Sequence, residues 1–150
     1  MTEDILAGAI QKEIQSRDFY SRVAEKVTQK KAKKTFTKLS NDEANHVSIL
    51  SRRFSKLFNK EYTPVQEETP EKMKIAEAEA YTLETSLQIV SLAIGLESEA
   101  IELYIREFEK SDDTEEKKML RKLVQFESGH KEKLQSQHDR LNKGKSWTLT

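Results

Sequence analysis

The sequence contains no cysteine, only two prolines and four glycines, and a single tryptophan among its 150 residues. The lack of cysteine excludes disulfides, thiolate metal sites and a rubredoxin-type iron centre within these residues. The longest uncharged stretch, residues 85–96, is shorter than the roughly 20 residues that a membrane-spanning helix needs. Few prolines and glycines together with 35% charged residues are typical of long, solvated helices joined by few turns.

An excess of charge of one sign is also missing, because 26 basic residues balance 26 acidic ones. The chain has no overall field to attract nucleic acid or an anionic membrane, and we expect neither as a partner. The first residues, MTEDIL, carry acids where a signal peptide carries bases, so we expect a cytoplasmic protein. The length predicts a single domain over residues 1–150 with a core of its own.

Apolar residues recur at helical spacing in four long segments. They predict helices at about residues 4–27, 33–58, 85–109 and 114–141. A crossover at about residues 59–84 holds both prolines, and we expect a short helical piece near residues 75–81. The tail, residues 142–150, contains Trp147, which covers either an edge of the core or a partner. This order predicts an all-α fold, a four-helix bundle made of two helical hairpins joined by a long crossover.

The two halves of the sequence are related by a repeat of 84 residues. The matching positions lie on the apolar stripes of the predicted helices: Ile10 and Ile94, Glu13 and Glu97, Tyr20 and Tyr104, Leu39 and Leu123, Glu43 and Glu127, His46 and His130, Leu50 and Leu134, and Leu57 and Leu141. Such a repeat predicts two similar hairpins related by a pseudo-twofold axis.

Two Glu-x-x-His motifs lie in the middle of these stripes. Residues one turn apart share a helix face, so Glu43 lies beside His46 and Glu127 beside His130. A single such motif arises easily by chance in a chain rich in glutamate, and it is then usually a surface pair. Chance does not explain two such motifs on core stripes, because they are separated by the same 84 residues as a further pair of glutamates.

The predicted hairpins bring these polar groups to one level in the core. Glu13 and the Glu43–His46 pair are equally far from a turn near residue 29, and the second half repeats this arrangement about residue 113. Four buried carboxylates repel one another, but two divalent cations neutralise them and two imidazoles complete the ligand set. We therefore predict two metal ions held by Glu13, Glu43, His46, Glu97, Glu127 and His130, namely iron, with manganese or zinc as substitutes.

Three further residues are candidates for orienting those ligands. Tyr20 and Tyr104 each follow a predicted ligand by two turns; each is either a core aromatic or a hydrogen-bond donor to a metal-bound carboxylate. Asp42 is placed to accept the distal N–H of the histidine from the other hairpin, where the repeat has Phe126 instead. His138 has no glutamate three residues before it, and we expect it at the surface or at the end of the core.

The motifs Glu13 with Tyr20, DEANH, Glu97 with Tyr104, and FESGH resemble the ferritin-like superfamily, most closely the rubrerythrin di-iron domain, over residues 4–141. The resemblance implies that Glu43 and Glu127 bridge two iron ions. Glu13 with His46, and Glu97 with His130, would complete the two shells. It also implies peroxide reduction with electrons relayed from a rubredoxin-like domain. These 150 residues contain no such domain, so we expect a separate donor such as a rubredoxin-like protein.

One departure from rubrerythrins bears on function. Ile94 stands where they carry an extra glutamate one turn before the third-helix ligand, so the site is more symmetric, like that of bacterioferritin. Three hypotheses remain: an oxidoreductase that reduces hydrogen peroxide or O2, a ferroxidase or iron-handling protein, and a non-redox metal-binding module or a hydroxylase. The resemblance favours the first and implies a homodimer built on outer helix faces.

Overall fold

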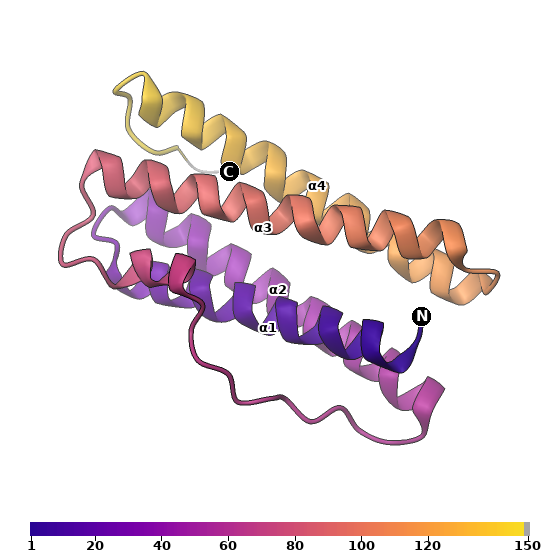
Figure 1. Ribbon diagram of the computed structural model, residues 1–150. Coiled ribbons are helices and arrows are strands. Elements are labelled where there is room, and N and C mark those ends of the chain that lie inside the picture. The colour runs from indigo at the N-terminus through magenta and orange to yellow at the C-terminus, as the bar shows by residue number, and fades with distance from the viewer. Residues whose placement is uncertain (149–150) are drawn as a thin grey trace. The chain divides into compact units, whose positions relative to one another are not determined.

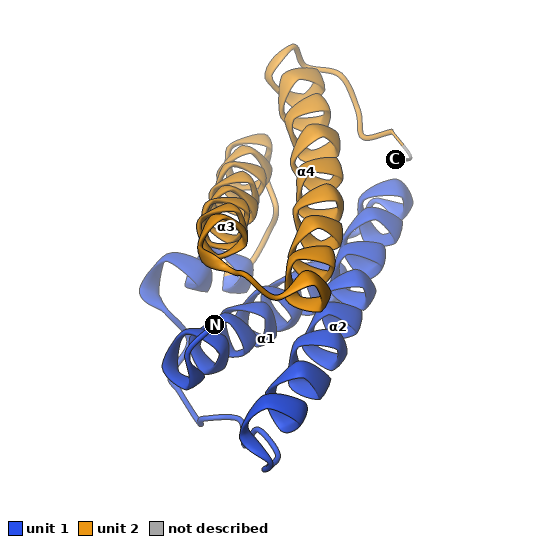
Figure 2. Ribbon diagram, turned by 90° about the vertical axis from the view of Figure 1, so that its right-hand side faces the viewer, with its two compact units in different colours: residues 1–77, 149 blue, residues 78–148, 150 orange. Residues whose placement is uncertain are grey.

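The computed structural model describes residues 1–148, and every regular element within that range is a helix. The order is α1 (Glu3–Lys26), α2 (Lys30–Phe58), the short 3-10 helix η1 (Glu71–Glu77), α3 (Leu83–Lys110) and α4 (Thr114–Asn142), as Figure 1 shows. Residues 1–77 and 78–148 form two compact units, coloured separately in Figure 2. The single domain over residues 1–150 stays a prediction. None of the helices in the described part of the chain is long and apolar enough to cross a membrane.

The first unit is built on the antiparallel pair α1 and α2. Thr2 caps α1 by accepting a hydrogen bond from the backbone N–H of Ile5 at 3.3 Å. The turn to α2 is short, and the ammonium group of Lys33 donates to the carbonyl of Ala24 near the end of α1. Asn59, in the left-handed conformation at φ 51°, ends α2; asparagine tolerates this conformation better than most residues.

The second unit pairs α3 with α4. Asp113 caps α4 by accepting from the backbone N–H of Glu116 at 2.8 Å. The described part of the tail folds back onto α4, where the Gln137 amide donates to the carbonyl and the hydroxyl of Thr148 at 2.8 and 2.9 Å. Gln137 also accepts a hydrogen bond from the backbone N–H of Thr148 at 3.1 Å. Trp147, the residue before Thr148, is only 4% exposed. Positions 149 and 150 of the predicted tail lie outside the described residues.

The crossover in the first unit runs along α1. Lys60 pairs with Glu3 at 2.8 Å, the Gln11 amide donates to the carbonyl of Val65 at 3.0 Å, and Gln15 donates to the Glu67 carboxylate at 2.7 Å. These contacts occupy one face of α1.

The short helical piece expected at residues 75–81 is wrong in position, because η1 begins four residues earlier, directly after Pro70. The Pro70 carbonyl accepts the first hydrogen bond, from the N–H of Met73 at 2.9 Å. Met73 and Ala76 are buried and three residues apart, which is the period of a 3-10 helix rather than of an α-helix.

An ion pair attaches η1 to α1 and should make this attachment depend on pH. Arg22 donates from Nε and from a terminal nitrogen to the two oxygens of Glu77, at 2.6 and 2.7 Å, and these hydrogen bonds lower the pKa of Glu77 below its ordinary value. A lowered pKa stabilises the folded state above the ordinary glutamate pKa of about 4.3, and the stabilisation is lost as the pH falls through the folded-state pKa. Hydrogen exchange of the Met73 amide should therefore be slower in the natural protein than in Arg22→Gln at pH 6. The difference should vanish at low pH; an equal difference at both pH values would contradict this account.

Candidate metal centre

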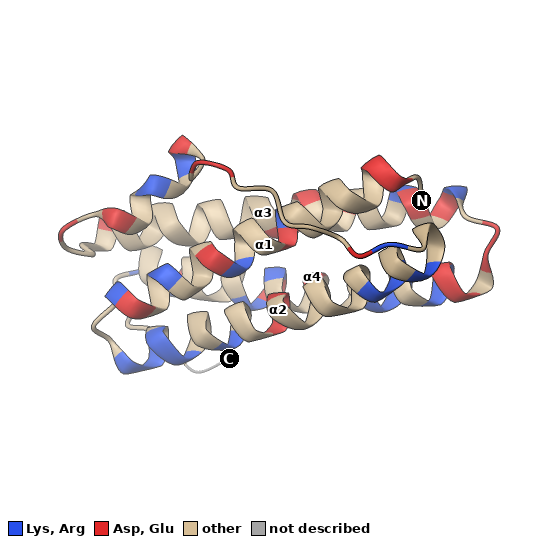
Figure 3. Cartoon of the chain, turned by 90° about the horizontal axis from the view of Figure 1, so that it is seen from below, with Lys and Arg blue, Asp and Glu red and all other residues tan. Residues whose placement is uncertain are grey.

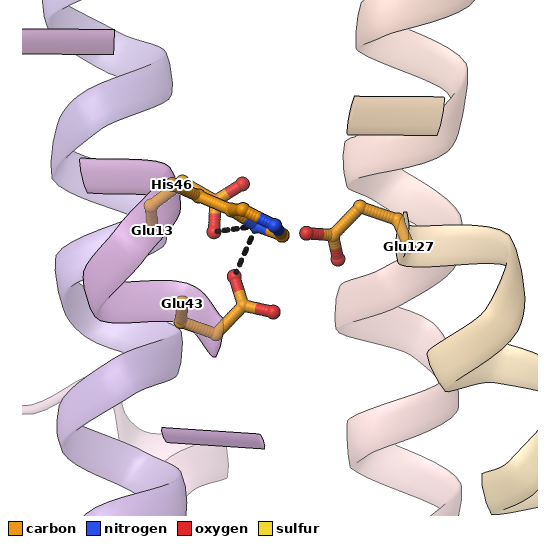
Figure 4. Close-up of side chains that lie close together, drawn as sticks. All are labelled: Glu13, Glu43, His46 and Glu127. Atoms are coloured by element: carbon orange, nitrogen blue, oxygen red, sulfur yellow. Dashed lines mark ion pairs between the residues drawn. The ribbon is translucent and has the colours of Figure 1, made fainter. Parts of the chain in front are cut away.

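The first unit contains a buried cluster of two carboxylates and one imidazole. Helix α1 supplies Glu13, and α2 supplies Glu43 and His46; all three side chains are at most 3% exposed. His46 Nδ1 lies 3.7 Å from Glu13 Oε2 and 3.5 Å from Glu43 Oε2, as the dashed lines in Figure 4 show. We refer to these three residues as the first half-site.

The helical pattern explains why these polar groups are buried. Glu43 and His46 continue the stripe of α2 that contains Phe36, Leu39 and Leu50, each at most 5% exposed. Glu13 continues the corresponding stripe of α1. Antiparallel packing brings the two stripes together at equal distances from the turn, so that the hydrophobic burial of the neighbours carries the three polar side chains into the core.

The second unit repeats this arrangement 84 residues later. His130 Nδ1 on α4 lies 3.5 Å from Glu97 Oε1 on α3 and 3.9 Å from Glu127 Oε2. Glu97 and Glu127 are 1% exposed and His130 is 4% exposed. We refer to these three residues as the second half-site.

The donor atoms of each half-site fit a divalent metal ion. Two ligand atoms that each lie about 2.1 Å from a metal are roughly 3.0–3.6 Å apart at the usual coordination angles. The four nitrogen–oxygen distances, 3.5 to 3.9 Å, lie at the upper edge of this range or slightly beyond it. Two carboxylates in each half-site balance one divalent charge, and oxygen with imidazole donors suits iron, manganese and zinc.

The sequence did not predict which ring nitrogen would face the carboxylates. In both half-sites it is Nδ1, so Nε2 is left for an outer hydrogen bond that would hold the ring in place. Helical spacing fixes the face on which a histidine lies but not its side-chain rotamer, so no pattern in the sequence carries this information.

The predicted orienting residues have different surroundings. Tyr20 is fully buried, with its ring centroid 6.0 Å from that of Phe36, and Tyr104 is 1% exposed. Asp42 is paired with Lys38 at 2.7 Å on the same helix. Phe126, its counterpart in the repeat, is 53% exposed. Hydrogen bonds from these residues to the ligands stay predictions.

An all-α chain with two repeated, buried clusters of two glutamates and a histidine has the features of a ferritin-like di-iron carboxylate protein. Residues 4–137 match the sequence profile of the rubrerythrin family, and the chain therefore belongs to that family. A search of curated protein sequences found no match.

Solved structures confirm the fold class. A hypothetical protein from Pyrococcus furiosus is 25% identical, with a TM-score of 0.84 over 97% of this chain and 92% of its own. A candidate ferritin-like diiron-carboxylate protein from Thermotoga maritima is 26% identical, with a TM-score of 0.74 over 91% of this chain and 93% of its own. The Cu(I)-bound form of CopM, at 10% identity, covers 93% of this chain and 96% of its own with a TM-score of 0.75, which shows the fold alone. The predicted ferritin-like helical-bundle fold is thus confirmed.

Proposed function

We propose that the two half-sites together hold a pair of iron ions, and that the protein reduces hydrogen peroxide or O2 with electrons from a separate donor. The observation that carries this proposal is the repeated, buried Glu/Glu/His cluster in a chain of the rubrerythrin family. A bound pair of Fe(II) ions would supply the two electrons that cleave the O–O bond of hydrogen peroxide, or that reduce O2 to the level of peroxide. Manganese or zinc would fit the same donors without giving the same reactivity.

Six residues of the chain would bind the two metals, some as shared ligands and some as ligands of one metal. Glu43 and Glu127 would each bind both metals, a role that the family resemblance implies. The remaining ligands would complete the two shells, Glu13 with His46 for one metal and Glu97 with His130 for the other. Burial of all six side chains keeps bulk water away from the donor atoms, which strengthens their electrostatic interaction with the cations.

The electrons have to come from another molecule. Reduction of one hydrogen peroxide to two waters consumes two electrons and two protons, and the 150 residues contain no cysteine that could hold an iron–sulfur relay. A separate rubredoxin-like protein is the donor that the family resemblance favours. We also propose that the protein forms a homodimer and is located in the cytoplasm.

A second function, ferroxidase or iron handling, is favoured by one particular residue. Ile94, one turn before Glu97 on α3, is an apolar side chain at the position where rubrerythrins carry an extra carboxylate. Without that carboxylate both half-sites have the same donor set, as in bacterioferritin. In this function iron would be the substrate, oxidised by O2 and then released.

The reaction with two oxidants should distinguish these functions. Protein loaded anaerobically with Fe(II) is mixed with hydrogen peroxide or with O2, and the oxidation of iron is followed by stopped-flow absorbance. We expect peroxide to react at least about tenfold faster than O2, which corresponds to about 1.4 kcal/mol between the two barriers. We also expect a rubredoxin and its reductase to restore the reduced form through repeated cycles.

The control is the double variant Glu43→Ala with Glu127→Ala, which should lose both the bound iron and the reaction. Faster oxidation by O2 with release of Fe(III) would assign the protein to iron handling instead. Oxidation by neither reagent would leave a non-redox metal-binding role.

A further inference from the structure

A cluster of lysines lies at the turn of the first hairpin. Residues 26–38 include six lysines and no acidic residue, namely Lys26, Lys30, Lys31, Lys33, Lys34 and Lys38, which we refer to as the lysine cluster. Figure 3 shows the run of blue segments at the beginning of α2. The 84-residue repeat offers a matched comparison, because residues 110–122 include five basic and four acidic residues. The formal charge is therefore +6 at the first turn and +1 at the second.

Local structure accounts for only half of the lysine cluster. Lys33 donates to the carbonyl of Ala24, Lys38 pairs with Asp42, and Lys26 lies close enough to Glu77 to lower its pKa. The other three members, Lys30, Lys31 and Lys34, are exposed and make no ion pair with the residues that the structure describes.

The position of the first lysines opposes helix stability. Lys30 and Lys31 lie in the first turn of α2, where the positive end of the helix dipole disfavours cations, and Lys34 follows in the second turn. Helices α1, α3 and α4 each begin with acidic residues in the first turn, whereas α2 has none. An arrangement that costs stability in one helix but is avoided in the other three suggests a role in binding.

Two buried aromatic residues lie between the lysine cluster and the first half-site along the helices of the first hairpin. Phe36 is buried two turns before Glu43 on α2, and Tyr20 is buried two turns after Glu13 on α1. Their ring centroids are 6.0 Å apart, so the two rings pack together, and both residues lie between the turn and the carboxylates along their helices. Lys34 lies nine residues before Glu43, which is about 14 Å along the helix axis. In the second hairpin the repeat places Leu120 where Phe36 would be, so the aromatic pair and the excess charge occur in the same hairpin.

We propose that the lysine cluster is the docking surface for an acidic electron-donor protein that carries a one-electron iron–sulfur centre. This inference rests on the proposed function. Two donor molecules would each be oxidised by one electron for every hydrogen peroxide reduced to two waters with two protons. The donor's centre would be held over the hairpin turn, from which Phe36 and Tyr20 provide a packed route to the first half-site.

The composition of the cluster favours a carboxylate-rich protein over a nucleic acid or a membrane. All six members are lysines, which act as point charges, whereas bidentate recognition of phosphate favours arginine. The whole chain is neutral, so an attraction at this turn comes from the local excess of positive charge. Such a patch accelerates encounter with an oppositely charged partner and weakens as salt screens it.

The test compares two charge-reversal variants. The first, Lys30→Glu with Lys31→Glu and Lys34→Glu, removes the three free members of the cluster and should fold, because acids at this helix end complement the dipole. The matched control, Lys118→Glu with Lys122→Glu and Lys133→Glu, makes the same change in net charge at exposed positions of α4. Reduced rubredoxin is the donor probe, and its oxidation by the peroxide-treated, iron-loaded protein is followed by stopped flow.

At low salt the first variant should react with rubredoxin at least about tenfold more slowly than the natural protein, and the control less than about twofold more slowly. The difference should shrink when salt shortens the Debye length from about 30 Å to about 8 Å. Durohydroquinone, a small neutral reductant, should reduce all three proteins at equal rates. Equal rates of rubredoxin oxidation in both variants would overturn the proposal.

Binding is measured separately on metal-free protein, so that a failure of docking can be told from a failure of the proposed function. Zinc-substituted rubredoxin should shift the backbone amide resonances of residues 26–38 in the natural protein and in the control, but not in the first variant. Shifts with no electron transfer to iron would support docking and refute the proposed function. An absence of shifts at low salt would refute docking. Binding of duplex DNA or phosphatidylglycerol vesicles through the cluster, with rubredoxin rates unchanged, would also overturn it.

Discussion

Saturating Fe(II), added without oxygen, is expected to raise the thermal stability of the protein by a large amount. Each ion that binds only the folded state adds about 4 kcal/mol when its free concentration is 1,000 times its dissociation constant. For a chain of 150 residues, one kcal/mol corresponds to roughly 2–4 °C, so two ions should raise the melting temperature by more than about 10 °C. Scanning calorimetry of the metal-free and loaded forms measures this difference.

The same scan on Glu43→Ala with Glu127→Ala controls for nonspecific binding of iron. This variant lacks one carboxylate from each half-site and should show little change in melting temperature with Fe(II). Equal melting temperatures of the natural protein with and without metal would contradict a site whose ligands are already assembled in the fold.

Metal-free protein should become more stable when two of its buried carboxylates are neutralised. Glu43 and Glu127 are each 1% exposed, and without metal each adds negative charge to a half-site that already contains another glutamate. Replacing a buried charge that lacks a cation with a neutral group of the same shape removes a penalty of several kcal/mol. We expect Glu43→Gln with Glu127→Gln to raise the free energy of unfolding by about 2–4 kcal/mol at neutral pH, measured by urea denaturation with a chelator present.

Glu107→Gln is the matched control for that experiment. Glu107 is also buried, at 5% exposure, but Lys110 lies 3.7 Å from its carboxylate, so loss of its charge should not stabilise the protein. If the double variant proved no more stable than the natural protein, the carboxylates of the half-sites would not be under the strain that a missing cation implies.

The long helices could be predicted because their signal is local and repeated. Apolar spacing placed each of them, with ends that differ by no more than three residues from the structure. The largest difference is at the start of α2, which begins at Lys30 rather than at residue 33. Gln29 makes no side-chain cap there, so the usual signal of a helix start is missing.

Other features depend on contacts that spacing does not encode. The place of η1 depends on Pro70 and on the burial of Met73 and Ala76. The docking of the tail depends on Gln137, because its side-chain amide donates to Thr148 and accepts from it after the chain has reversed direction. Neither contact leaves a periodic trace in the sequence.

The sequence predicted the residues of the half-sites but not their side-chain conformations. Their members could be found from the sequence because a glutamate and a histidine one turn apart must share a helix face, and because the 84-residue repeat relates both motifs to a further pair of glutamates. The nitrogen that faces the carboxylates could not be found, since it depends on side-chain rotation. The lysine cluster was visible as six lysines without an acid, but only the structure showed which three have no ion-pair partner among the described residues.

The magnetic state of iron in the reconstituted, oxidised protein distinguishes one shared di-iron centre from two separate iron sites. If the two half-sites hold two bridged irons, elemental analysis should find two irons per chain, and Mössbauer spectra should show paired Fe(III) ions with a diamagnetic ground state. Two magnetically isolated high-spin Fe(III) ions, or an iron content near zero, would contradict a shared centre built from Glu13, Glu43, His46, Glu97, Glu127 and His130.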